Sequence, residues 1–313
     1  MGARLFDWRD LAVLQRYQDE SVFLDSELLL TRGQLLVPGV LISYLTPTLG
    51  IFTCVAGDSH RDGAHVMGQF IHLPGNTISH LTFLAPGQTL DAGLVCELVE
   101  YMIVLSGERG AMRLLADADE HSQAYEMLRK CGFAIYNRQR IWRIMPQNSN
   151  IRSSIHTWRM ATDQDVIPVR NLYNNLVPGL VQQIEPFSMQ HPRGMVYYQN
   201  GELLAYLELR LGHRGIWVQP FIHPDAEDVP GHLLDFIGKI SGRRKRPIYI
   251  CIRSYQSWLE PAIEELGAKA GHRQAVMVRQ LIMPQKVTRP FAIPALEGGQ
   301  TEISAPIARL GNQ

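Results

Sequence analysis

Apolar residues in the first half of the chain recur with strand-like and helix-like periods in turn. Residues 76–87 alternate as a strand does, and residues 90–110 carry an apolar stripe at helical spacing. Residues 111–119 form a second apolar run. After a polar turn, Ala124 and Leu128 recur at helical spacing ahead of a strand over 133–144. The pattern predicts the order strand, helix, strand, helix, strand.

Upstream of this segment the same patterns predict one helical region and two strands. Residues 11–30 place apolar side chains at helical spacing, which predicts a helical N-terminal face. Residues 42–56 and 65–74 are rich in β-formers, and the turn-forming residues 57–63 separate them. The first half is therefore expected to begin with helix and then a meander of strands.

The second half repeats this order of elements. Thr162 or Asp163 can cap a helix that follows a short strand, and Asn200-Gly201 is a typical hairpin turn. The expected elements are a strand and a helix in 158–177, three strands in 194–224, a helix over 232–240, a strand over 247–254, a helix over 258–271 and a strand over 275–283.

A short repeated sequence motif supports a tandem duplication. Residues 83–86 read Phe-Leu-Ala-Pro and residues 221–224 read Phe-Ile-His-Pro, and a helix, a strand, a helix and a glycine follow each. We expect two separately folded α/β domains of one shape, each with a mixed, mostly antiparallel sheet flanked by helices. They span residues 1–146 and 158–284, with a linker over 147–157 and a polar, Pro- and Gly-rich tail over 285–313.

The segment from Leu114 to Phe133 resembles the C-terminal half of a GNAT-type N-acetyltransferase domain. In that family the pattern Asn-x-x-Ala-x-x-x-Tyr-x-x-x-Gly-Phe marks a helix beside acetyl-coenzyme A. Ala124, Gly132 and Phe133 match it, while His121 stands at the Asn position and Leu128 at the position of the Tyr, which is often the general acid. The second half carries Ile263 at the matching position, so neither half has the family tyrosine.

The resemblance also implies a pyrophosphate loop with the pattern Arg/Gln-x-x-Gly-x-Gly/Ala, whose glycines let backbone amides approach the phosphates. In the first half Gln88 and Gly93 fit and Ala92 lies beside them, but Asp91 replaces the first glycine. In the second half only Gly231 of residues 226–231 fits. The first half is therefore the expected coenzyme site, although an aspartate at a helix start can simply be a cap. The cofactor-binding residues implied are Phe83, Leu84, Gln88, Ala92, Gly93, His121 and Ala124.

His80 is the candidate general base, because it precedes this loop and its near-neutral titration suits deprotonation of an amine. Its alternative role is that of a half-buried strand histidine. Tyr125 and Tyr101 are the candidate acids, although Tyr125 points about 100° away from the position of the missing tyrosine. No paired-cysteine or histidine spacing predicts a metal site.

Composition narrows the classes of partner. Thirty basic residues balance thirty acidic ones, and the run Arg243 to Arg246 is typical of a solvated loop, so no nucleic acid is expected. No apolar run approaches the roughly 20 residues that span a bilayer, and no signal peptide is recognised, which predicts a cytoplasmic protein without membrane partners. The four cysteines are expected to be reduced and mostly buried.

The resemblance implies an N-acyltransferase that moves an acetyl or other acyl group from coenzyme A to a small-molecule or peptide amine. Direct transfer of this kind needs positioning and a modest base rather than a covalent enzyme intermediate. The alternative is a non-catalytic tandem GNAT-like module that binds a metabolite or a protein partner. The sequence identifies neither the acceptor nor the oligomeric state.

Overall fold

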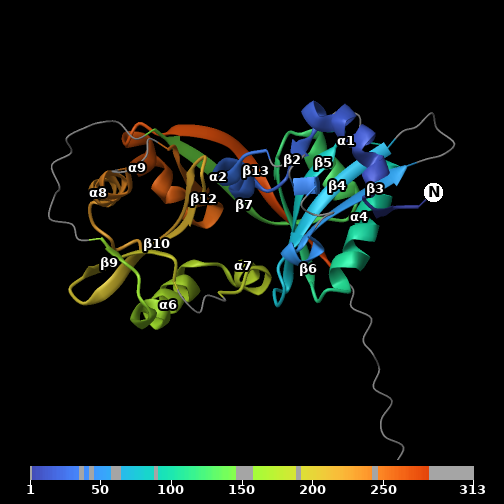
Figure 1. Ribbon diagram of the computed structural model, residues 1–313. Coiled ribbons are helices and arrows are strands. Elements are labelled where there is room, and N and C mark those ends of the chain that lie inside the picture. Colours follow the sequence, from blue (N-terminus) through green and yellow to red (C-terminus); the bar gives the residue numbers. More distant parts are fainter. Residues whose placement is uncertain are drawn as a thin grey trace, which may run out of the picture. The chain divides into compact units, whose positions relative to one another are not determined.

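A single mixed sheet runs through both halves of the chain in the computed structural model (Figure 1). The expected linker and tail lie outside the residues that the structure describes, which are 2–34, 39–41, 46–57, 65–87, 91–145, 158–187, 192–241 and 246–281.

The first half contains strands β1 to β7 and the helices between them. Their bounds are β1 Arg4–Leu5, α1 Leu11–Tyr17, β2 Val22–Phe23, α2 Ser26–Arg32, β3 Ile51–Gly57, β4 His65–His72, β5 Ile78–Ala85, α4 Ala92–Gly107, β6 Arg113–Asp119, α5 Gln123–Lys130 and β7 Ala134–Ile144. Asp25 begins α2 by accepting a hydrogen bond from Leu28 N–H, which interrupts the single helical region expected over 11–30 and leaves room for β2.

The second half follows the same order. Its elements are β8 Arg159–Met160, α6 Val166–Leu176, α7 Gly179–Ile184, β9 Gly194–Gln199, β10 Glu202–Leu211, β11 Ile216–Ile222, α8 Val229–Ser241, β12 Ile248–Arg253, α9 Glu260–Glu265 and β13 Lys269–Gln280. Asn200 and Gly201 both have positive φ, as the predicted hairpin turn requires. Helix α9 is shorter than expected, since Gly267 ends it at positive φ and β13 starts at Lys269.

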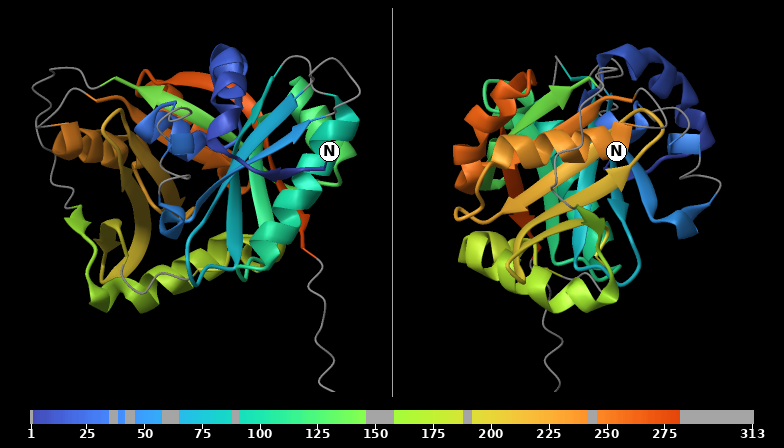
Figure 2. Two further views of the ribbon diagram at one scale, coloured as in Figure 1. Left: turned by 45° about the vertical axis from the view of Figure 1, so that its right-hand side comes forward. Right: turned by 90° about the vertical axis from the view of Figure 1, so that its left-hand side faces the viewer.

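The two halves exchange their last strands. The order across the sheet is β1-β3-β4-β5-β6-β13-β7-β12-β11-β10-β9-β8, so β13 lies between β6 and β7, and β7 lies between β13 and β12 (Figures 1 and 2). Each half is completed by a strand of the other, and residues Met1–Ile282 form one compact unit. The strand pairing therefore does not divide the sheet into two independently folded halves. The boundaries at 146 and 158 stay predictions of where one repeat ends and the next begins.

An internal pseudo-symmetry relates the two halves of the sheet. Gln139 and Gln274 each stand seven residues after the left-handed glycine that precedes their strand, and they lie opposite each other. Gln139 Nε2 donates to Gln274 Oε1 at 3.0 Å. The equivalent residues of the two exchanged strands thus meet at the middle of the sheet.

A second repeated contact fixes the start of each half. Arg4 forms a bidentate ion pair with Asp10, and Arg159 forms one with Asp165, with all four N–O distances at 2.7 Å. In both halves the aspartate also accepts a backbone N–H three residues before it, which closes a capping box. The duplication predicted from the order of elements is thus present at the level of side-chain contacts.

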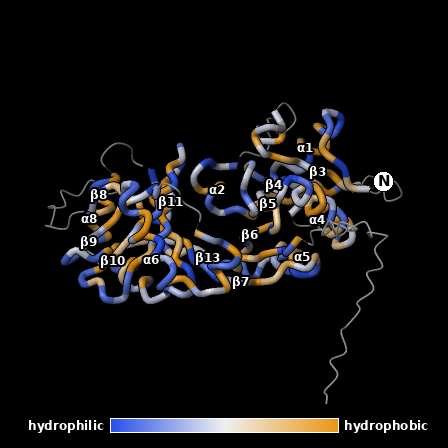
Figure 3. Tube along the Cα trace, turned by 90° about the horizontal axis from the view of Figure 1, so that it is seen from below, coloured by the Kyte–Doolittle hydropathy of each residue, from blue (hydrophilic) through white to orange (hydrophobic). Residues whose placement is uncertain are grey.

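Apolar cores lie on both faces of the sheet. Helices α4 and α5 cover one face of the first half, and α8 and α9 cover the corresponding face of the second. The opposite face carries a third core in which Val169 and Tyr173 of α6 pack with Leu115 of β6 and Val276 of β13. The tube in Figure 3 changes repeatedly between orange and blue along the strands and helices, as elements with one buried face do.

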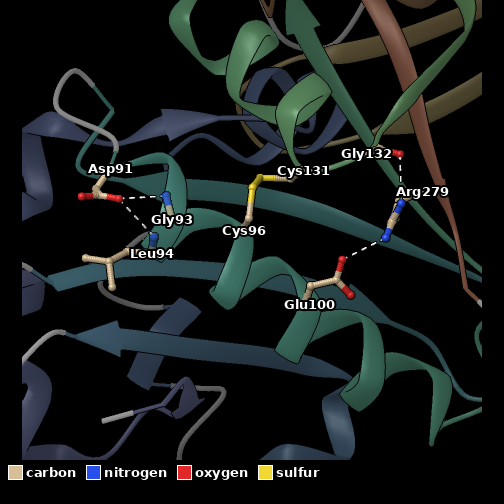
Figure 4. Close-up of a disulfide and its surroundings, with 8 residues drawn as sticks. All are labelled: Asp91, Gly93, Leu94, Cys96, Glu100, Cys131, Gly132 and Arg279. Atoms are coloured by element: carbon tan, nitrogen blue, oxygen red, sulfur yellow. Dashed lines mark hydrogen bonds and ion pairs between the residues drawn. A yellow bond between two sulfur atoms is a disulfide. The ribbon is translucent and has the colours of Figure 1, made fainter.

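A disulfide joins Cys96 of α4 to Cys131 at the end of α5 (Figure 4). Their Cα atoms are 5.0 Å apart, within the range that a disulfide spans. The expectation of four reduced cysteines is wrong for this pair, because the packing of two helices brings together residues 35 positions apart. Cys54 and Cys251 are buried free thiols, as expected.

The strand exchange predicts that a chain cut between its halves stays together. A protease site inserted between residues 150 and 151 and then cleaved should leave one species on size-exclusion chromatography and one thermal transition, since β7 and β13 each belong to the other half's sheet. The uncleaved insertion variant is the control. Elution of two separate fragments would contradict the exchange.

The disulfide predicts a measurable loss of stability when it is removed. Cys131→Ser should lower the free energy of unfolding by about 4 kcal/mol, the value for a closed loop of this length in the chain-entropy description. Urea denaturation with and without dithiothreitol measures the loss. A midpoint of the wild type that reductant leaves unchanged would show that the bond does not form in solution.

Candidate functional site

Two pairs of parallel strands separate part-way along their length. β5 and β6 pair only from Ile78 to His80, and β11 and β12 pair only from Ile216 to Val218. All four strands continue further, so a gap opens at the carboxyl ends of each pair. Such a gap leaves backbone N–H and C=O groups available to a ligand, and the carboxyl ends of parallel strands are where α/β sheets bind ligands.

In the first half β2 fills this gap. It pairs with β5 in antiparallel fashion. Leu24 then bridges both strands, because its N–H donates to Thr82 O at 2.8 Å and its C=O accepts from Asp117 N–H at 2.7 Å. The chain itself therefore occupies the position that an extended ligand would need.

In the second half no strand of the described residues pairs with β11 beyond Val218 on the side of β12. At the far end of β11, Gln256 Nε2 donates to Ile222 O at 3.3 Å. Pro220 lies between these points and has no N–H to offer. The second gap is thus the one with an edge of β11 that no described strand covers.

Aspartate side chains cap the helices that follow both gaps. Asp91 Oδ1 accepts from Gly93 N–H at 2.8 Å and from Leu94 N–H at 3.3 Å (Figure 4). Asp228, at a φ of 45°, accepts from Gly231 N–H at 3.2 Å. The alternative that these residues serve as caps is confirmed, and amides at both helix starts already have a carboxylate partner.

A strip of polar side chains crosses the face of the sheet that α6 and α7 cover. Strand register places Glu208 and Arg210 of β10 on the same face as Tyr206, which belongs to the core beneath α6. Strand register places further polar residues of β11, β12, β7, β13 and β6 on this face, among its apolar residues. These further members of the strip are Gln219, Cys251, Arg253, Gln139, Gln274, Asp117 and Asp119.

Charged side chains from both halves meet over the β10 end of this strip. Arg210 Nη2 lies 2.8 Å from Glu208 Oε1, and Arg210 Nε lies 3.9 Å from Glu27 Oε1 of α2. Burial raises the pKa of Glu27 to about 7 against the pull of Arg210, and it also raises the pKa of Glu208. The Glu27 side chain is still 44% exposed, so solvent and a ligand can reach it.

A second group of charges lies at the end of β12. Arg253 Nη2 pairs with Glu185 Oε2 at 3.3 Å, and Tyr136 OH donates to the other oxygen of Glu185. Burial and the charge of Glu185 raise the pKa of Tyr136 well above its usual value, which keeps this phenol protonated. Glu185 follows α7, so the second half's helices hold this group in place.

Asp117 on β6 is a further titratable group on this face of the sheet. Burial raises its pKa to about 6, although Arg253 and a hydrogen bond from Ser26 N–H at 3.2 Å oppose the change. His80 lies near enough to lower the pKa values of both Asp117 and Glu27. Perturbed titratable groups that gather in one place are typical of functional sites.

The structure separates the three predicted catalytic residues. His80 is exposed on β5 and lies opposite Leu115 of β6, two residues before Asp117. Tyr101 and Tyr125 belong to α4 and α5 and pack against the core on the opposite face of the sheet. The hydroxyl of Tyr125 accepts from Arg129 at 3.4 Å.

The predicted cofactor-binding residues lie around the first gap. Leu84 and Ala124 are buried in the core under α4, whereas Phe83 points into the core beside α1. Ala92 and Gly93 form the capped start of α4, and His121 is exposed before α5. Gln88 lies outside the described residues. With β2 in the gap, these positions serve packing and capping, and their binding role stays a prediction.

Sequence reasoning missed most of the charged strip. Glu208, Arg210 and Arg253 stand in otherwise apolar strands, a signal that was visible in the sequence. Glu27 and Glu185 gave no such signal, because their importance depends on helices of one half lying near strands of the other.

No three His, Cys, Asp or Glu side chains of the described residues are grouped to hold a metal ion. No helix in the same part of the chain is long and apolar enough to cross a bilayer. Of the basic run, the structure describes only Arg246, which donates to Gly212 O.

Comparisons with known proteins find likeness only among solved structures. No family model matches the chain, and no curated protein matches it. A GCN5-related N-acetyltransferase from Sphaerobacter thermophilus is 9% identical, with a TM-score of 0.48 over 73% of this chain and 80% of that one. A tandem GNAT protein from the clavulanic acid biosynthesis pathway is 12% identical, with a TM-score of 0.45 over 74% and 83% of the chains.

A third similar structure, a GNAT-family acetyltransferase from Colwellia psychrerythraea, is 13% identical, with a TM-score of 0.43 over 90% of this chain and 100% of that one. All three carry names of the GNAT family, which the sequence also resembles. A likeness at this level does not extend to activity or ligand.

The raised pKa of Glu27 predicts how its variant responds to pH. A group whose pKa is higher in the folded state stabilises below its unfolded value, and that contribution is lost as the pH rises toward 7. Glu27→Gln should therefore melt higher than wild type at pH 8, and the difference should shrink at pH 5. Thermal denaturation at both pH values measures this, with the exposed Glu202→Gln as the control. An equal difference at both pH values would refute the shift.

Proposed function

We propose that this protein transfers an acyl group from coenzyme A to an amine bound over the charged strip, with the thioester arm in the gap between β11 and β12. The observation that carries the proposal is that Gln219 and Arg253 of the strip flank the one gap whose edge no described strand covers. The same observation favours the second half as the coenzyme site over the first, where β2 fills the gap.

Glu27 is the proposed general base. Its raised pKa of about 7 suits a group that must accept a proton near neutral pH, and its side chain is accessible to solvent. The bound ammonium group first gives one proton to the Glu27 carboxylate and becomes a neutral amine. Its nitrogen then forms a bond to the thioester carbon, and the carbon–sulfur bond breaks. The leaving thiolate takes the second proton from the nitrogen, so the coenzyme leaves as the thiol.

Each charge near Glu27 has a defined effect on this step. Arg210 keeps part of the Glu27 population ionised, and Glu208 holds Arg210 in place. The strip brings in more carboxylates than guanidinium groups, which favours a cationic amine. Positioning and a modest base are sufficient for direct transfer, so the missing helix tyrosine does not prevent it.

A second candidate function is binding of an amine without transfer. The observation that favours it is the capping of α8 by Asp228, which occupies an amide that a pyrophosphate would use. Binding of acetyl-coenzyme A separates the two candidates, since a simple amine-binding module has no need of it.

The pair Asp228→Gly and Asp91→Gly tests both the function and the choice of half. Asp228→Gly removes a negative charge and frees the α8 amide, so acetyl-coenzyme A should bind about five-fold tighter, on the order of 1 kcal/mol at low salt. Asp91→Gly is the matched control and should leave the affinity unchanged, because β2 fills the first gap. Isothermal titration calorimetry measures both, with one site expected per chain.

Three outcomes would count against the proposal. Tighter binding by Asp91→Gly alone would move the coenzyme to the first half. Absence of binding in wild type and both variants would leave the amine-binding module. Wild-type transfer that Glu27→Gln does not slow by at least about 100-fold would remove Glu27 as the base.

A further inference from the structure

Two buried donors on β12 and β7, the middle strands of the sheet face that carries the strip, have no hydrogen-bond partner within the described part of the chain. They are Arg253 Nη1 and Asn137 Nδ2. Only 6% of Asn137 is exposed, and the Arg253 side chain is 12% exposed. A buried donor left without a partner loses its hydrogen bonds to water without replacement, so two of them in one place indicate a ligand that supplies acceptors.

The two donors belong to one neighbourhood. Ser254, the residue after Arg253, donates to Asn137 Oδ1 at 3.0 Å. In that contact the amide oxygen of Asn137 accepts a hydrogen bond, while its nitrogen has no acceptor within the described residues. Arg253 is held in turn through Nη2 by Glu185, which leaves Nη1 available. A guanidinium and an amide N–H fixed in this way are suited to a carboxylate.

Carboxylates lie on the side of this neighbourhood toward α2. Strand register places Asp117 opposite Val276 and Val276 opposite Asn137, and Asp117 accepts from Ser26 N–H at the start of α2. Glu27 is the next residue of that helix. Donors that suit an anion therefore lie on β12 and β7, and a carboxylate that suits a cation lies on α2, over the same face of the sheet.

We propose that the strip binds a small zwitterion of the amino acid class, with its carboxylate on Arg253 and Asn137 and its ammonium group toward Glu27. As a statement about the acceptor of acyl transfer, this rests on the function proposed above. The binding itself does not depend on it, so ligand binding in the absence of coenzyme tests the inference separately.

The first experiment uses the wild-type protein without coenzyme. The twenty standard amino acids, β-alanine and γ-aminobutyrate are screened by thermal shift, and the best ligand is compared in calorimetry with its carboxamide and its decarboxylated amine. We expect at least one amino acid to bind, and both analogues to bind at least ten-fold more weakly. Equal binding of the decarboxylated amine, or no binding by any member of the panel, would overturn the proposal.

The second experiment reverses the polarity of one donor. Asn137→Asp keeps the size of the side chain and its contact with Ser254, but it replaces the free N–H with a carboxylate oxygen. The amino acid should bind at least ten-fold more weakly, while the decarboxylated amine should bind at least as well as to wild type. Asn171→Asp on the exposed surface of α6 adds the same charge and should change neither affinity.

Two results in the variants would contradict the assignment. Equal losses for the amino acid and the amine in Asn137→Asp would indicate a general disturbance of the site rather than a carboxylate contact. Unchanged amino acid affinity in both Asn137→Asp and Arg253→Lys would place the carboxylate elsewhere. Acetyl-coenzyme A affinity, measured on the same samples, tells a failed acceptor site from a failed coenzyme site.

Discussion

The exchange of β7 and β13 is the contact on which the rest of the molecule depends. It joins two meanders into one sheet and makes Gln139 and Gln274 neighbours at the centre. The ladders connect β6 to β13, β13 to β7 and β7 to β12, and each ladder places two members of the charged strip opposite each other. Without the exchange, Asp117 and Arg253 would belong to separate sheets, and no continuous face would hold both.

The two halves differ in whether the gap between their parallel strands is filled. In the first half the segment around β2 satisfies the backbone of β5 and β6, and α2 follows it directly. That insertion also brings Glu27 to Arg210 of the other half. The loss of one potential ligand gap and the formation of the charged strip are thus two effects of the same short segment.

Sequence patterns were sufficient for the elements with strong periodicity. Strands β5, β6 and β7 and helices α4 and α8 lie where apolar spacing predicted them, and Gly132 ends α5 with positive φ as its position indicated. The order of elements and the α/β class with a mixed sheet followed from these. The ion pairs Arg4–Asp10 and Arg159–Asp165 are also visible in the sequence as a repeat. Each half has an arginine six residues before an aspartate near its start.

The parts that sequence could not predict depend on long-range pairing. β2 has only two residues and no periodicity, and its strand conformation comes from the edge of β5 that it covers. The choice of partner for β7 and β13 is invisible to a pattern, because a strand with one apolar face fits either half equally well. The candidate site shares this limit, since Glu27, Glu185 and Arg253 come together only after that choice is made.

The exchange also fixes the order in which this protein can be completed as it is synthesised. β13 contains some of the last described residues, yet it pairs along the whole of β6, and Gln274 bonds Asp119 across 155 positions. The emerging first half therefore exposes the edge of β6 until β13 has left the ribosome. During that interval β6 of one nascent chain can accept β13 of another, which makes neighbouring chains on one messenger competitors for the same edge.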